Sequence, residues 1–502
     1  MKLLVTIDGA IAAGITTFRW STEEGHIDAL GRVYEPRVIQ AGNYSRSLVR
    51  EGGTWGRSQA GYGLIEINNA DGALDGLLSY AFNGRDVTIS RTDGTVILRG
   101  TVGGFEFRRR SIAFRLRDRQ AVVADRLIVP DTYAGTNSGG VGLEGTANDI
   151  KGAGRPRVFG KLRAIRPAFV NTSINAFQLS AGPVASVDQV QDGGSVITAG
   201  SVYTTLADLQ VTAPSGGTVR AFLGNAADGS FIRTGSDPVR ILTADVTEGA
   251  TSADRTPAGI MRRILLSAGL PAGDVEGVAD VDSVAGWTAG YYVPPGGNVT
   301  ARAALDAMAQ SVHGYWVGTR SGAIRLGVLR APEGIPRLVV EDWAILEDGS
   351  AIERIVTEGE GLPFWRVTVR YQRVWTPQTR DQLAGIAKTT QEYLTQEWRA
   401  TAPREDASIL SLNPLARELT VDAHLDAEAD AIALRDALWT LYSVQRDTFT
   451  VAVPSEIAIG VDLADVVQLK TTRFGMSSGR LFRVVGIDED LARSRAILTL
   501  WG

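Results

Sequence analysis

The sequence contains few of the side chains that build catalytic or metal centres. It has no cysteine and only three histidines, His26, His313 and His424, which are far apart in the chain. Disulfides, thiolate zinc sites, iron–sulfur clusters and cysteine nucleophiles are therefore excluded. No HExxH or P-loop motif is present. We predict structural roles for all three histidines, with His313 closing a helix beside Gly314, where a cation suits the helix dipole.

Two loops contain residues that bind ions or nucleotides in other proteins. Residues 68–75 (Asn-Asn-Ala-Asp-Gly-Ala-Leu-Asp) are rich in oxygen ligands, but they lack the spacing and the final glutamate of an EF-hand. We predict a turn followed by a short helix there. Residues 140–145 match GxGxxG, yet glycines and a proline in 152–156 interrupt the helix that a dinucleotide site needs. We predict a plain loop.

Neither the basic nor the acidic side chains single out a site. Arg108-Arg109-Arg110 resembles a basic patch, and we interpret it as the solvated tip of a hairpin. Two carboxylates about 5–9 Å apart would serve glycoside cleavage, but none of the 56 acidic residues stands out as a pair. We therefore predict no catalytic residue, no cofactor-binding residue and no metal ligand.

The composition is that of a folded chain with several domains. At about 150 residues per domain, 502 residues suggest three to four domains. Hydrophobic residues make up 44% of the chain and the net charge is −5. This charge argues against a strongly basic nucleic-acid binder and against a polybasic membrane anchor. Asp8 interrupts the apolar start, so we predict a first strand and no secretion signal.

The hydrophobic pattern predicts a mainly β, multidomain fold with an α+β part. Residues 1–165 read as a β domain, 166–245 as a small β domain or insertion, 246–340 as an α+β domain, and 341–502 as a second β domain with one long helix at 427–445. Asp93-Gly94 predicts a hairpin with a type I′ turn, because both central residues of that turn need positive φ. Gly103-Gly104 is expected to separate two further strands.

The α+β part carries the clearest local signals. Thr256 is a candidate N-cap for a helix over 257–268, and Thr300 for a helix over 301–312. A hairpin follows over 315–326, with its turn at Ser321-Gly322.

One internal echo links the two ends of the chain. Val102-Gly103, an arginine-rich turn and residues 112–116 resemble Val485-Gly486, a charged turn and residues 497–500. Two domains of related fold would produce this echo, and so would chance.

Three stretches carry a resemblance to a known family. The first joins Tyr-Glu-Pro-Arg-Val at 34–38 and Ala-Gly-Asn-Tyr-Ser at 41–45 to 61–69, 71–75 and 82–85; the second is 154–167; the third runs from 442 through 465–467 and 479–487 to 498–502. Together they resemble the tail-tip or baseplate hub proteins of long-tailed bacteriophages and prophage-like particles.

The resemblance implies a structural role without catalysis or a cofactor. It implies a homotrimer in the virion, at the distal end of the tail, assembled in the cytoplasm of a bacterial host. Two tube-like β domains per chain, 1–165 and 341–502 here, would let three subunits present a pseudo-six-fold ring to the hexameric tail tube. Such a hub contacts tube and distal tail proteins, the tape-measure protein and tail fibres, and DNA passes through it without specific binding.

Two other functions stay open from the sequence. The segment 166–245 could bind a host glycan or pilus, with Tyr203, Phe222 and Phe231 either stacking on sugars or filling a small core. The unassigned region 166–340 could instead belong to a tail enzyme that degrades cell wall or glycan.

Overall fold

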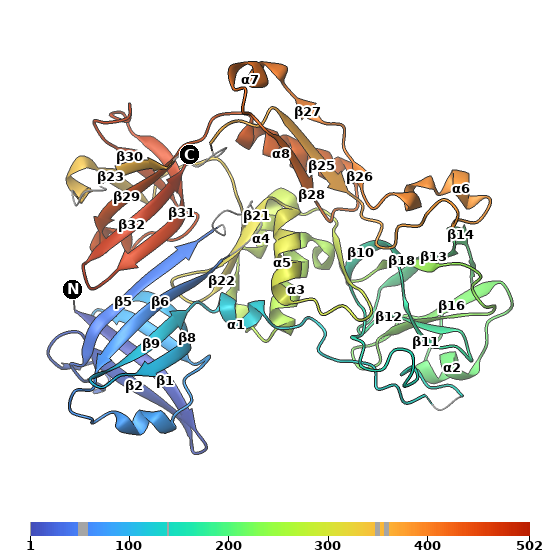
Figure 1. Cartoon of the computed structure of the whole chain (residues 1–502), viewed down its shortest axis with the longest axis horizontal. Helices are drawn as coiled ribbons and strands as arrows, with labels where there is room; N and C mark the ends of the chain where they lie inside the picture. The colour runs from blue at the N-terminus through green and yellow to red at the C-terminus, as the bar shows by residue number, and fades with distance from the viewer. Residues whose placement is uncertain (1, 49–58, 138–139, 347–351, 356–360) are drawn as a thin grey trace.

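The computed structural model describes residues 2–48, 59–137, 140–346, 352–355 and 361–502. The fold is mainly β and multidomain, as predicted. Figure 1 shows the strands of the two chain ends side by side, in blue and red, on one side of the molecule. A helical centre follows in yellow-green, and a second β domain in green lies on the opposite side.

Both chain ends contribute to one 13-stranded sheet, whose main path runs β2-β1-β7-β8-β9-β6-β5-β31-β32-β29-β24. Strands β30 and β23 branch from β31. The N-terminal strands are β1 (Leu3–Ile11), β2 (Gly14–Ser21), β5 (Val38–Ser47), β6 (Gln59–Asn68), β7 (Asp86–Arg91), β8 (Val96–Phe107) and β9 (Ser111–Arg117). The C-terminal strands are β23 (Leu338–Glu341), β24 (Ile352–Ile355), β29 (Thr448–Pro454), β30 (Val466–Lys470), β31 (Arg480–Asp490) and β32 (Arg495–Trp501).

The turn between β7 and β8 differs from the predicted type. The hairpin forms, but only Gly94 has positive φ, at 87°, and Asp93 does not. The Arg91 amide donates to the Thr95 carbonyl at 2.9 Å, so the loop has three residues instead of two. A three-residue loop needs one left-handed position, which Gly94 supplies. The type I′ prediction was therefore wrong.

The glycine pair at 103–104 lies inside a strand and does not separate two strands. β8 runs through it as one strand, and its register against β9 shifts between Val102 and Gly104. An extra residue bulges out of the ladder at this point. Glycine suits such a site because it has no side chain to hold against the neighbouring strand.

The central part packs helices against a small sheet. It contains α1 (Gln120–Ala124), α3 (Pro257–Ser267), α4 (Val278–Ala285), α5 (Ala301–Gln310), β19 (Val275–Glu276), β21 (Gly314–Gly318) and β22 (Ile324–Val328). Thr256 caps α3 and Thr300 caps α5, each accepting a hydrogen bond from a first-turn amide. Both predicted helices and the hairpin after them are confirmed. The core of this part includes Met308 and Trp316, which are fully buried.

The second β domain consists of two five-stranded sheets. One contains β10 (Arg157–Ile165), β13 (Ser186–Asp192), β14 (Ser195–Val196), β18 (Leu242–Thr247) and β20 (Gly290–Val293); the other contains β11 (Ala168–Asn171), β12 (Ala176–Ser180), β15 (Thr198–Ala199), β16 (Thr218–Phe222) and β17 (Ser230–Thr234). A short helix, α2 (Leu206–Val211), covers one end. Tyr203, Phe222 and Phe231 are buried in its core, so they are not available to stack on sugars.

The remaining segment forms a small sheet beneath the longest helix. Its elements are β25 (Arg366–Tyr371), α6 (Ala387–Thr390), β26 (Arg399–Ala400), β27 (Arg404–Glu405), α7 (Ala407–Leu412), β28 (Glu418–Asp422) and α8 (Glu428–Tyr442). Leu434 and Leu438 of α8 are buried in one core with Val367 and Val369 of β25. Within the described residues, no helix combines the length and the apolar character that crossing a membrane requires.

Candidate functional site: the junction of two related β units

Five N-terminal strands and five C-terminal strands form units with the same topology. The spatial order is β5-β6-β9-β8-β7 in the first unit and β24-β29-β32-β31-β30 in the second. The chain order is also the same, and every neighbouring pair is antiparallel in both units. A short helix follows the second strand in each: η1 (Asp75–Ser79) and α9 (Ser455–Ala458).

The two units also share their register. Across the strands, the row Tyr44–Gly63–Leu116–Val102 in the first unit matches Arg354–Phe449–Leu500–Val484 in the second. The β-bulge recurs at the next step, between Val102 and Gly104 in β8 and between Val484 and Gly486 in β31. Such agreement favours a duplicated unit over chance as the cause of the sequence echo.

The segment that leads into the third strand of each unit, β7 and β30, has the same backbone contact in both units. Gly84 has φ 75° and donates from its amide to the Val102 carbonyl at 2.7 Å. Ala464 occupies the same place, with φ 70° and an amide that donates to the Val484 carbonyl at 2.8 Å. A non-glycine residue rarely adopts this left-handed conformation. Ala464 therefore retains a backbone shape that suits a glycine.

The two units are joined head to tail by direct strand pairing. β5, the edge strand of the first unit, pairs antiparallel with the second half of β31, with Ser47 opposite Gly486 and Asn43 opposite Asp490. The first half of β31 pairs with β30. The junction thus makes one continuous sheet from the two ends of the chain (Figure 1).

The turn of the β21–β22 hairpin in the central part contributes a buried arginine to this junction. Arg320 lies in the β21–β22 turn, and its guanidinium forms an ion pair of 2.8 Å with Glu489 of β31. The side chains are only 9% and 2% exposed. The same guanidinium donates to the carbonyls of Val461 at 2.8 Å and Ala458 at 3.2 Å. One side chain therefore holds the central hairpin against the C-terminal unit.

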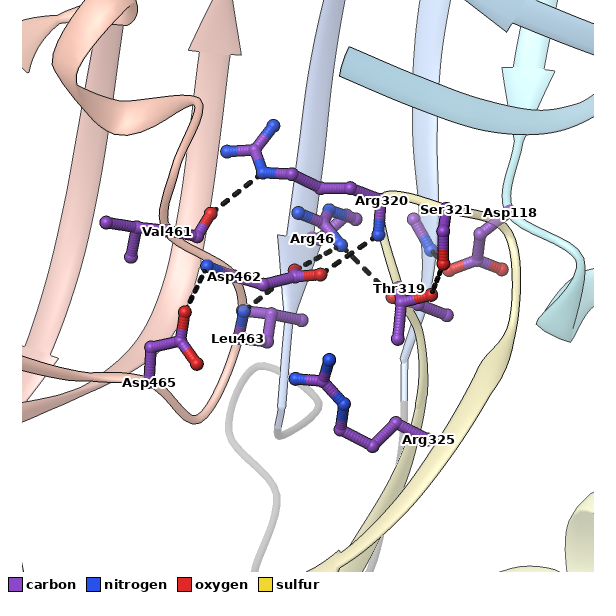
Figure 2. Close-up of polar contacts among 12 residues, drawn as sticks. Arg46, Asp118, Thr319, Arg320, Ser321, Arg325, Val461, Asp462, Leu463 and Asp465 are labelled. Atoms are coloured by element: carbon purple, nitrogen blue, oxygen red, sulfur yellow. Dashed lines mark hydrogen bonds and ion pairs between the residues drawn. The ribbon is translucent and has the colours of Figure 1, made fainter. Parts of the chain in front are cut away.

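A second buried arginine ties the N-terminal unit to the same place. Arg46 of β5 contacts Asp462 at 2.7 Å, and it donates to the Gly318 carbonyl at 3.1 Å (Figure 2). The other oxygen of Asp462 accepts a hydrogen bond from the Arg320 amide at 3.0 Å. The N-terminal strand, the central hairpin and the C-terminal loop therefore meet at one carboxylate.

Burial and charge shift the pKa values of two acids here in opposite directions. Burial alone would raise the pKa of Asp462, but the guanidiniums of Arg46 and Arg320 hold that pKa below its usual value. Burial raises the pKa of the Asp118 carboxyl to about 6, even though the Gly61 amide donates to it at 2.5 Å.

Sequence reasoning did not find this cluster. It predicted the turn that carries Arg320, yet the partners Arg46 and Glu489 lie far away in the chain. The only sequence signal was the echo between the two ends, which indicated that they could be related.

The interpretation of His313 as a helix-end cation was wrong. His313 is buried and its Nε2 lies 2.8 Å from the Tyr442 hydroxyl. Burial lowers the pKa of His313 to about 3, so the ring is neutral. Burial and the nearby Arg373 lower the pKa of His424 to about 3 as well, and its ring stacks on Trp375. His26 lies in the short strand β3 (His26–Ile27), which pairs with β4 (Val33–Tyr34).

The other candidate stretches form the local structures predicted for them. Residues 68–75 form a turn leading into η1, and Arg37 forms an ion pair of 3.0 Å with Asp71. The glycine motif at 140–145 is a loop, and residues 146–156 after it contain no helix. Arg108-Arg109-Arg110 forms the exposed tip between β8 and β9. No group of histidine, aspartate and glutamate residues suited to a metal ion occurs in the described chain.

A groove of about 330 Å³ lies on the second β domain. Ser195, Thr218, Ser236 and Asp237 line it, with Val239 88% exposed at its edge. The carboxylate of Asp192 and the guanidinium of Arg240 also line the groove, beside aliphatic side chains such as Val196 and Ile197.

Comparisons with known proteins give similarity only to solved structures. No protein-family model matches the sequence, and a search of curated proteins gives no match. A tail protein from Neisseria meningitidis MC58 is 10% identical, with 94% of this chain and 93% of that chain covered and a TM-score of 0.41. The 43 kDa tail protein of prophage MuSo2 from Shewanella oneidensis is 11% identical, with 100% and 98% covered and a TM-score of 0.39. A chain of the virion of a native gene transfer agent particle is 17% identical, with 76% and 92% covered and a TM-score of 0.42.

Proposed function

We propose that this chain is a structural hub of a bacteriophage tail tip, in which copies of the chain form a ring beneath the tail tube. The observation that carries the proposal is the duplicated β unit. One chain holds two copies of the same five-stranded topology, joined head to tail in one sheet. A head-to-tail contact is heterologous, and repeated heterologous contacts generate closed rings when the rotation closes.

The number of units supports three copies per ring. Each chain supplies two related units, so three chains supply six. A tail tube with six-fold symmetry would then meet six similar surfaces, as the resemblance to hub proteins implies. The arginine-locked junction supports the same role, because it fixes the angle between the two units of one chain.

The rest of the proposed role follows the family resemblance. The ring would lie in the virion at the tail tip, bind the tube, distal tail, tape-measure and fibre proteins, and leave a path for DNA without sequence-specific contact. The net charge of −5 suits such a path, because phosphates bind mainly to clusters of basic side chains.

Native mass spectrometry of the purified chain tests the proposal. We expect a species close to three times the chain mass of 53.5 kDa. Labelling with antibody should also decorate the tips of purified tails in electron micrographs. A chain that stays monomeric at high concentration and is missing from purified particles would contradict the proposal.

The groove on the second β domain favours one additional function, glycan binding at the host surface. This domain lies on the side of the molecule opposite to the sheet that would form the ring (Figure 1). We expect the purified chain to bind an array of bacterial surface polysaccharides. Val239→Trp should fill the groove and abolish binding, whereas Val211→Trp, on an exposed valine of α2 in the same domain, should not. Equal binding by both variants would exclude the groove.

A further inference from the structure

We propose that strand β24 of one copy pairs antiparallel with the second half of β8 in the next copy, with Glu353 opposite Arg108, Arg354 opposite Phe107 and Ile355 opposite Glu106. This inference rests on the proposed ring and names the surfaces that close it. The contact would repeat, between copies, the β5–β31 pairing that already joins the two units inside one chain.

The first argument is an open half-strand on β8. In the second unit, β30 pairs only with Arg480–Arg483 of β31, and β5 pairs with Gly486–Asp490 on the side that β30 leaves free. In the first unit, β7 pairs only with Val96–Thr101 of β8. Among the described residues, no strand pairs with Gly104–Phe107 on that side.

The second argument is an open edge on β24. Its counterpart β5 has a strand on each side, β6 and β31. β24 pairs with β29 on one side, and the described residues place no strand on the other. Unpaired backbone amides and carbonyls along a strand edge bind another strand readily. Each chain therefore has both unpaired edges that the contact needs: β24, which corresponds to β5, and the second half of β8, which corresponds to the second half of β31.

The shared register fixes which residues would face each other. Asn43, Tyr44 and Ser45 of β5 lie opposite Asp490, Glu489 and Asp488 of β31. In the second unit, Glu353, Arg354 and Ile355 of β24 occupy the positions that correspond to these β5 residues. In the first unit, Arg108, Phe107 and Glu106 occupy the positions that correspond to these β31 residues.

One pair of opposite charges would meet at these positions. Glu353 would face Arg108 on one face of the sheet, whereas Arg354 would lie beside Phe107 on the other face, because successive side chains of a strand point to opposite faces. All of these side chains are accessible in the single chain: Arg108 is 50%, Glu106 43% and Arg354 42% exposed. Opposite charges on facing strands favour pairing. The register was derived from backbone pairing alone, so this complementarity is an independent observation.

Disulfide cross-linking tests the contact in a chain that has no native cysteine. The double variant Glu106→Cys, Ile355→Cys places one thiol on each proposed strand. Under mild oxidation of the assembled protein we expect covalent dimers and trimers in denaturing gels. The positive control is the double variant Asp488→Cys, Ser45→Cys, which holds the equivalent pair inside one chain and should lose its free thiols without changing mass.

A negative control uses the other end of β8. The double variant Asp93→Cys, Ile355→Cys carries an exposed thiol in the β7–β8 turn and should give no covalent oligomer. The strand contact would be overturned if native mass spectrometry shows oligomers and the positive control oxidises, but the cysteines at positions 106 and 355 form no cross-link. That result would leave the ring proposal standing. A chain that is monomeric at every concentration would overturn the ring itself.

Charge reversal gives a second readout that does not depend on oxidation. Arg108→Glu or Glu353→Arg alone should weaken assembly about five-fold, because like charges would face each other. The double variant should recover most of the wild-type assembly. A double variant no better than the single variants would contradict the proposed register.

Discussion

Replacing Arg320 tests whether the buried ion pair holds the two β units together. Arg320→Met keeps the apolar stem and removes the guanidinium. Glu489 is only 2% exposed and would lose its partner, while the carbonyls of Val461 and Ala458 would lose a donor. Leaving one member of a buried pair alone costs about 3–5 kcal/mol.

The loss should be local to the junction. Amide hydrogen exchange reports the opening free energy of single strands, which suits a multidomain chain better than one global unfolding transition. We expect the opening free energy of β5 and the second half of β31 to fall by about 3 kcal/mol or more. The sheets of the second β domain, which do not contact Arg320, should keep their protection.

Two further variants separate the ion pair from a general effect of losing an arginine. Arg370→Met removes an exposed pair with Asp422, so its cost should stay below about 1 kcal/mol. In the double variant Arg320→Met, Glu489→Met no charge remains unpaired, and it should lose about 1–3 kcal/mol less than the sum of the single changes. A loss below about 1 kcal/mol in Arg320→Met would refute the assigned role.

Three more predictions concern single positions. Between about pH 4 and 6 the folded chain holds a proton on Asp118 that the unfolded chain has lost, so this residue lowers the free energy of unfolding by about 3 kcal/mol as pH rises through that window. Asp118→Asn should remove this change in thermal unfolding measured at several pH values, and an unchanged pH dependence would contradict the raised pKa. His313 acts in the opposite direction, because its folded-state pKa of about 3 lies below the unfolded value. Its contribution to stability is complete above about pH 6.5 and is lost as pH falls toward about 3. In His313→Asn, hydrogen exchange of α5 should therefore be less sensitive to acid than in the wild type, and equal sensitivity would contradict this. Because both positions have positive φ, Ala464→Gly should stabilise the C-terminal unit by about 0.5 kcal/mol, and Gly84→Ala should destabilise the N-terminal unit by about 1 kcal/mol or more. Equal melting temperatures for the two variants would count against the shared backbone shape.

Local patterns predicted the elements, because local chemistry sets them. Thr256 and Thr300 are N-caps, and the strands at 87–91 and 112–116 lie where the alternation placed them. The failures also have local causes. Gly103-Gly104 has the composition of a turn, but β9 pairs with β8 from Thr101 to Phe107, on both sides of the glycines, so the strand continues and the glycines form a bulge.

The candidate site could not be predicted, because it depends on pairing between distant parts of the chain. Arg46 and Asp462 are 416 positions apart, and nothing near either residue in the sequence marks it as buried. The charged identity even argues against burial, since arginine and aspartate are mostly exposed in proteins. Only the echo between 102–116 and 485–500 contained information on this scale, and strand register was needed to interpret it.

The buried charges at the junction fix the angle between the two β units more than they add to the free energy of unfolding. A buried ion pair is often no more stabilising than apolar residues of the same size. It is, however, directional: Arg320 and Arg46 satisfy their partners only when β5, β31 and the central hairpin meet at one angle. A ring of head-to-tail units closes only if each junction turns by the same fixed amount, and a junction with a variable angle gives open chains. The contact inside each chain therefore sets the angle that the contact between chains must reproduce.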